Sequence, residues 1–102
     1  MKKIIAKISR VLLDGHRQEL GEFAFLDDEY FNLYHGVVSS SGLAEGSFMP
    51  WLGFKIQLKE DNVVIKKLLP PEENECHVEV GQTCAFDFNN VGKYEVNIVS
   101  VE

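Results

Sequence analysis

The residues of this chain that are best suited to chemistry are its histidines and cysteines, which bind metals and transfer protons near neutral pH. The three histidines, His16, His35 and His77, form no HxH or HExxH pattern, and no cysteine pair has the spacing of a zinc site. Cys76 and His77 are adjacent, but neighbouring residues of a strand point to opposite faces. A thiolate–imidazole pair is therefore excluded wherever this segment is a regular strand.

The serines and glycines offer no better site. Serines cluster at positions 39 to 41 and at Ser47, but none lies in the GxSxG pattern of a hydrolase nucleophile. The glycines at positions 36, 42 and 46 match neither a phosphate-binding loop nor a dinucleotide fingerprint. The sequence therefore predicts that the protein is not an enzyme, with no catalytic residue, no metal ligand and no cofactor.

Charge is distributed unevenly along the chain. The net charge of -6 comes from 16 acids and 10 bases. Between Gln18 and Phe54 there are six acids and no lysine or arginine, and a second base-free acidic stretch runs from Leu68 to Gly92. Such segregation commonly serves solubility, but where it serves binding it favours a cationic partner over a polyanion.

An acidic segment that also contains tyrosines offers both parts of a protein interface. Carboxylates speed the approach of a basic partner, and a tyrosine that is buried on binding slows its release. Helix capping is a competing explanation for the three acids at positions 27 to 29. The residues that we expect to bind a partner are Glu19, Glu22, Asp27, Asp28, Glu29, Tyr30 and Tyr34.

Nucleic-acid binding is the main alternative. Trp51 could supply a stacking surface, as aromatic side chains do in OB-type barrels. The acidity of the whole chain opposes the electrostatic attraction that dominates nonspecific binding to nucleic acid, so we expect no nucleic-acid partner. The basic residues that could share one sheet face are Lys7, Arg10, Arg17, Lys55, Lys59, Lys66 and Lys67.

The elements that must position these residues are β-strands. From Trp51 to Lys59, apolar and polar residues alternate with a period of two, which predicts a strand with one solvated face. We expect its apolar side chains, Leu52, Phe54, Ile56 and Leu58, to form the centre of the core. The same period recurs at 76–80, 84–88 and 94–98.

The first third of the chain predicts a hairpin and then one helix. A strand over 3–13 reverses at Asp14-Gly15, and its second arm, 19–26, places Gly21 with Phe23 on one face and Leu20 on the other. Asp27 is then a candidate N-cap for a short helix that ends at Gly36. The segment from Tyr30 to Val38 can also be read as a strand.

The second half predicts two further reversals. A two-residue loop at Asp61-Asn62 would place Leu58 opposite Ile65. At the next reversal, a three-residue connection, 81–83, would align the two arms as a hairpin, unless the chain changes sheets there. In the hairpin register Cys76 and Cys84 lie about 13 Å apart, so we expect two reduced thiols. The polar segment 38–50 is expected to be a long connection.

The start and the end of the chain resemble one known family. The strand Ala6-Lys7-Ile8 and the turn Asp14-Gly15-His16-Arg17 look like the opening of the C-terminal β-barrel of elongation factor Tu, where a strand runs into a Gly-Gly-Arg turn. The ending is also similar, from Val80-Gly81-Gln82 to the last alternating strand at Val101. This resemblance implies a small closed Greek-key barrel.

These observations combine into one set of expectations. The chain of 102 residues is long enough for a single domain, 1–102, with one core. We expect an all-β barrel or sandwich of six or seven strands with one short helix after Leu26, in the cytoplasm, with no membrane-spanning segment. We expect a non-catalytic, acidic inhibitor or immunity-type protein that sequesters a basic partner protein such as a toxin. The alternative is a barrel-type module associated with RNA or the ribosome.

Overall fold

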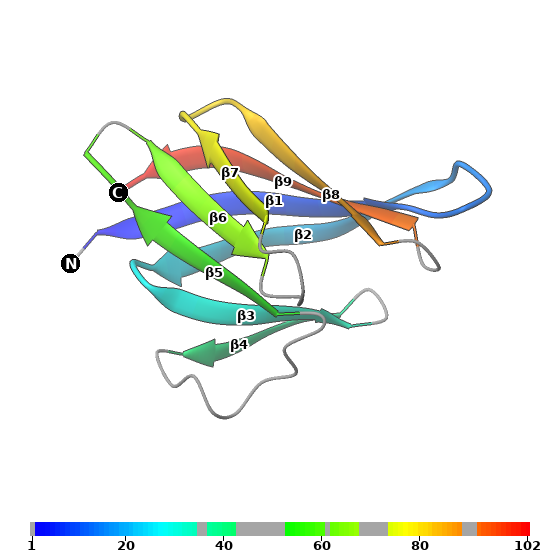
Figure 1. The fold of residues 1–102 in the computed structure, drawn as a ribbon, viewed down its shortest axis with the longest axis horizontal. Coiled ribbons are helices and arrows are strands. Elements are labelled where there is room, and N and C mark those ends of the chain that lie inside the picture. The colour runs from blue at the N-terminus through cyan, green and yellow to red at the C-terminus, as the bar shows by residue number, and fades with distance from the viewer. Residues whose placement is uncertain (1, 35–36, 43–52, 61, 68–73, 89–91) are drawn as a thin grey trace.

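The computed structural model describes the chain except for residues 1, 35–36, 43–52, 61, 68–73 and 89–91. The described residues form an all-β structure (Figure 1) and include no helix, and hence none that could cross a membrane. The expected all-β class is therefore confirmed, whereas the expected helix is wrong, and the described residues form nine strands instead of six or seven. The strands are β1 (Lys3–Val11), β2 (Arg17–Leu26), β3 (Glu29–Tyr34), β4 (Val37–Gly42), β5 (Gly53–Leu58), β6 (Val63–Lys67), β7 (Asn74–Val78), β8 (Thr83–Phe88) and β9 (Gly92–Val101).

The strands form two antiparallel sheets that pack as a sandwich. One sheet has four strands in the order β2-β1-β9-β8, and the other has five in the order β4-β3-β5-β6-β7. Apart from β4, neighbours in space follow chain order, and β1 pairs with β9. The arrangement therefore resembles an up-and-down barrel that is flattened and opened where the chain changes sheets, between β2 and β3 and between β7 and β8. The closed barrel implied by the resemblance is not formed by these strands.

Four phenylalanines connect the sheets through the core. The ring of Phe31 lies between those of Phe25 and Phe54, with centroid distances of 4.6 and 5.3 Å, and Phe54 contacts Phe86 edge-on at 5.0 Å. Phe31 and Phe54 belong to the five-stranded sheet, whereas Phe25 and Phe86 belong to the four-stranded sheet. Aromatic pairs at these distances gain attraction beyond the burial of their area. This column is the centre of the sandwich.

The core predicted for the central strand is confirmed in part. Phe54 and Ile56 are fully buried, and Leu58 is partly buried and packs against the core. Leu52 lies outside the described residues. The hairpin between β5 and β6 has a different register from the predicted one, because Leu58 pairs with Val63 and Ile56 with Ile65. A longer turn, closed by a bond of 2.8 Å from Lys59 N to Asn62 O, shifts the pairing by two residues and so preserves the inward faces.

A β-bulge corrects the predicted faces of β2. Ile8 pairs with Gly21 and Ser9 with Glu19, so Leu20 is an extra residue in the ladder. Gly21 has φ of +126°, a conformation that glycine adopts without steric cost. As a result Leu20 packs against the core, as Phe23 does, instead of lying on the opposite face as alternation predicted. The bulge therefore widens the apolar inner face of β2.

The segment predicted as a helix is a tight corner followed by a strand. β2 ends at Leu26 and β3 begins at Glu29, with Asp27 and Asp28 between them. Asp28 has φ of +65°, and aspartate is one of the few residues that tolerate this region. Beyond the corner, Phe31 and Leu33 point into the core with a period of two. The alternative strand interpretation of this segment is therefore the correct one for 29–34.

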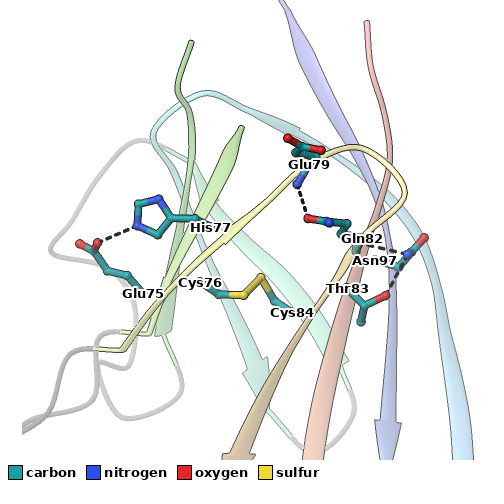
Figure 2. The surroundings of a disulfide bond; sticks show 8 residues. All are labelled: Glu75, Cys76, His77, Glu79, Gln82, Thr83, Cys84 and Asn97. Carbon is teal, nitrogen blue, oxygen red and sulfur yellow. Dashed lines mark hydrogen bonds and ion pairs between the residues drawn. A yellow bond between two sulfur atoms is a disulfide. The ribbon is translucent and has the colours of Figure 1, made fainter. Parts of the chain in front are cut away.

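The two cysteines form a disulfide, which contradicts the expected reduced thiols. β7 and β8 do not pair as a hairpin, because the chain changes sheets at residues 79–82, the alternative that the sequence left open. Cys76 and Cys84 then face each other across the core, with their Cα atoms 6.0 Å apart (Figure 2). This separation lies within the ordinary range for a disulfide. The bond joins the edges of the two sheets.

We predict that Phe54→Ala lowers the free energy of unfolding by about 3–5 kcal/mol, through lost burial and the cavity left in the phenylalanine column. Leu13 is 74% exposed in the β1–β2 turn, so Leu13→Ala is the control, and it should cost less than about 0.5 kcal/mol. Urea unfolding measures both. Equal losses would show that the column is not the centre of the core.

A second prediction concerns the disulfide. The double variant Cys76→Ala/Cys84→Ala should lose about 2–3 kcal/mol of stability, because the short loop closed by the bond then gains freedom in the unfolded chain. Adding a reductant should destabilise the wild type by a similar amount and leave the double variant unchanged. A wild-type unfolding midpoint that does not respond to reductant would contradict the disulfide.

Candidate partner-binding surface

The acids expected to bind a partner divide into two groups, and the first group closes the β2–β3 corner. Asp27 Oδ1 accepts a hydrogen bond of 2.7 Å from the backbone N–H of Leu58. Asp28 Oδ1 accepts one of 2.6 Å from Gln57 Nε2 and lies 3.8 Å from Lys55 Nζ. Both carboxylates therefore tie the corner to β5, about thirty residues further along the chain. This role does not require a partner protein.

Glu29 and Tyr30 are buried rather than exposed. Glu29 is 8% exposed, and its Oε1 accepts a hydrogen bond of 3.1 Å from Leu26 N, across the same corner. Tyr30 is 9% exposed, and Lys55 Nζ lies 5.2 Å from the centre of its ring, a cation–π distance. The expectation that Tyr30 is an exposed aromatic is therefore wrong. Tyr34 ends β3, and its side chain is outside the described part of the structure.

Glu19 and Glu22 form the second group, and both are exposed on β2. A spacing of three residues would place them on opposite faces of a regular strand. The bulge changes this, because Glu22 pairs with Lys7 and Glu19 with Ser9, two positions on the same outer face of β1. Within the described chain, neither carboxylate makes an ion pair or a side-chain hydrogen bond. With Lys7 and Gly21 they line an open depression of about 550 Å³.

The seven basic residues that could have formed a nucleic-acid surface do not share one sheet face. Lys7, Arg10 and Arg17 belong to the four-stranded sheet, where Arg17 forms an ion pair with Glu95 and donates to Ser9 Oγ at 3.0 Å. Of the other four candidates, Lys55, Lys66 and Lys67 belong to strands of the five-stranded sheet, and Lys59 directly follows β5.

In that sheet Lys55 and Lys66 are direct cross-strand partners. Like charges in such positions repel, and each lysine has an acid nearby, Asp28 at 3.8 Å and Glu75 at 4.0 Å. Lys67 points inward instead, and its Nζ donates to the carbonyl oxygen of Asp87 at 3.3 Å. Of the seven candidate bases, only Lys55 and Lys66 are therefore direct neighbours on the outer face of this sheet.

The histidines of the described chain are exposed and pair with neighbouring acids. His77 Nε2 lies 3.2 Å from Glu75 Oε2, and its ring points away from the disulfide, as expected for the residue next to Cys76 in a strand (Figure 2). His35 is outside the described residues. Among those described, no three His, Cys, Asp or Glu side chains are placed to hold a metal ion.

Among the described acids, Asp14 is the one whose pKa the structure clearly shifts. The backbone N–H of His16 donates to Asp14 Oδ1 at 3.0 Å, and the His16 ring lies 2.9 Å from Oδ2. These bonds, the backbone bond first, lower the pKa of Asp14 below its ordinary value of 3.8. A lowered pKa means that the ionised form favours the folded turn above the ordinary pKa, and that this contribution is lost as the pH falls through the lowered pKa.

Two features characterise this surface, the β2–β3 corner and the exposed face of β2. No family model, curated protein or solved structure matches this chain. Only the sequence and the geometry of the chain itself therefore bear on its function. Sequence reasoning identified Glu19 and Glu22 but missed the bulge that places them on one face. The signal of the bulge in the sequence was Gly21, a glycine inside a strand pattern, between Leu20 and Glu22.

We predict that Asp27→Ala destabilises the protein by about 0.5–1.5 kcal/mol, because Leu58 N loses its hydrogen-bond partner. Glu19→Ala is the matched control, since it also removes an acid, and it should change the stability by less than about 0.5 kcal/mol. Thermal or urea unfolding of the two variants gives the comparison. Equal effects would mean that Asp27 does not stabilise the corner.

Proposed function

We propose that this protein is a non-catalytic binding module that sequesters a basic partner protein, in the manner of small acidic inhibitors and immunity-type proteins. The observation that supports this best is the pair Glu19 and Glu22, which are exposed on one face and use no partner within the described chain. The net charge of -6 adds a long-range attraction for a cationic protein. A toxin is the kind of partner that such a small inhibitor would neutralise.

The hydrogen bonds of the acids change which of them we propose to contact the partner. Asp27, Asp28 and Glu29 make bonds that hold the corner, so their contribution to binding is limited to their charge. Glu19 and Glu22 become the principal residues for steering the partner. An aromatic anchor at Tyr34 remains part of the proposal.

The compartment is also part of the proposal. The cytoplasm was expected together with two reduced thiols, whereas Cys76 and Cys84 are joined. Disulfides persist mainly in oxidising compartments and are rare in the cytosol. We therefore favour capture of the partner in an oxidising compartment. Alkylation of intact cells before lysis tests this, because cytosolic protein would present two reactive thiols.

The alternative function is an RNA- or ribosome-associated module, as the resemblance to the elongation factor barrel implies. The observation in its favour is the adjacent pair Lys55 and Lys66 on the outer face of the five-stranded sheet. Against it stand the acids beside both lysines and the negative charge of the chain. The following experiment separates the two functions.

We predict that the immobilised protein captures a basic protein from an extract of its source cell, and that Glu19→Lys/Glu22→Lys weakens this capture. With the purified partner, the double variant should lower the association rate constant by about tenfold and reduce its dependence on salt, while changing dissociation little. Asp87→Lys/Glu79→Lys is the control, because it makes the same change of charge elsewhere on the surface.

Mass spectrometry of the captured material and surface plasmon resonance provide the two measurements. Capture of RNA that survives Glu19→Lys/Glu22→Lys but is lost in Lys55→Ala/Lys66→Ala would contradict the proposed function and support the alternative.

A further inference from the structure

One sheet of the sandwich has one strand fewer than the other, and the smaller sheet ends at β2. The chain changes sheets between β7 and β8 on one side and between β2 and β3 on the other, so β8 lies beside β7 and β2 beside β3. β4 extends the five-stranded sheet one position beyond β3, whereas the four-stranded sheet ends at β2. In Figure 1, β4 lies below β3, on the side of β3 away from β5. One more strand beside β2 would give both sheets the same width.

The inner surface at this margin is apolar and only partly covered. Leu20 and Phe23 of β2 pack against the core but remain partly exposed. Val38 of β4 pairs with the fully buried Leu33 and therefore faces inward, and it too is partly exposed. Leu20, Phe23 and Val38 are thus partly exposed apolar side chains on the inner faces of the edge strands β2 and β4, and we call these three residues the ledge. A strand laid beside β2 would cover this ledge with every second side chain.

The backbone of β2 can accept such a strand. β2 has ten residues, and in the described structure it pairs only with β1. Alternate N–H and C=O groups therefore point outward along its other edge, and an edge of this kind is a template for adding a strand. β7 and β8, in contrast, are edge strands that lie together and are joined by the disulfide.

Charge determines which strand fits. Glu19 and Glu22 lie on the outer face of β2; Lys7 is the cross-strand neighbour of Glu22, but neither acid forms an ion pair within the described chain, so two carboxylates face one lysine there. A second copy of this protein is disfavoured, because antiparallel pairing through the middle of β2 would bring both pairs of carboxylates together, and each copy carries a charge of -6. A basic segment would meet the opposite charge at the same positions.

We propose that the outer edge of β2, which has no partner strand in the described part of the chain, pairs with an extended segment of the basic partner, in which apolar and basic residues alternate. The apolar residues cover the ledge of Leu20, Phe23 and Val38, and the basic residues lie outward beside Glu19 and Glu22. The added strand becomes the fifth strand of the smaller sheet. This inference rests on the proposed function, since it names how a basic partner is held.

The test uses the whole protein and a soluble, acetylated octapeptide of alternating lysine and valine. Two further peptides are controls: one has the same composition with four lysines followed by four valines, and the other alternates glutamate and valine. Hydrogen exchange of the β2 amides that do not donate to β1 reports pairing directly. We expect the alternating lysine–valine peptide to slow exchange of these amides at least tenfold, and the two control peptides to leave it unchanged.

Charge variants complete the test. Glu19→Lys/Glu22→Lys should weaken binding of the alternating peptide about tenfold, whereas Asp87→Lys/Glu79→Lys should change it less than twofold. Binding of the block peptide equal to that of the alternating one, without protection of β2, would overturn strand addition and leave the proposed function intact. Protection that rises with protein concentration in the absence of peptide would assign the edge to a second copy and overturn the proposal. Equal binding of the glutamate peptide would overturn the basic occupant.

Failure of the proposed function has a different signature. In that case neither the alternating nor the block lysine peptide binds, and the capture experiment recovers no basic protein that depends on Glu19 and Glu22.

Discussion

The apolar layer between the sheets requires the chain to change sheets without leaving polar backbone groups unpaired, and the structure meets this constraint differently at its two corners. At the β2–β3 corner, carboxylates replace the missing ladder, since Asp27 accepts from Leu58 N and Glu29 from Leu26 N. At the β7–β8 corner, Gly81 N bonds to the carbonyl of Ile98, and a covalent bond joins Cys76 to Cys84. The phenylalanine column fills the space between these two corners.

The strands and part of the core could be predicted from the sequence because alternation is a local signal. Phe54 and Ile56 are buried as predicted, and the first turn at Asp14-Gly15 is present. The helix was wrong because an acid that caps a helix and an acid that closes a corner have the same local sequence. What distinguishes them is the partner of Asp27, Leu58 N, which is distant in the chain. The disulfide was missed for a related reason, because its geometry depends on a change of sheet.

The candidate site shows the same limit. Net charge and the base-free segment singled out five acids of this region as candidates, but they gave no sign that the five have different surroundings. Three of them lie at the corner, where the folded chain already supplies donors, and only Glu19 and Glu22 remain exposed without a partner among the described residues. The bulge at Gly21 decides that these two share a face, and a bulge depends on pairing with β1 rather than on the composition of β2. The shared face of Glu19 and Glu22 could therefore be found only from the pairing register of β1 with β2.

The order of the strands also has a consequence for how the chain reaches this structure. Of the seven strand pairings described, five join strands that are consecutive in the chain, and such hairpins close over short loops. The pairing of β1 with β9 is the opposite case, because it brings together segments from the two ends of the sequence. Closing so long a loop costs the most chain entropy, so this ladder should be the last to form during folding. Until then the smaller sheet exists as two separate hairpins, each tethered to the larger sheet by one corner.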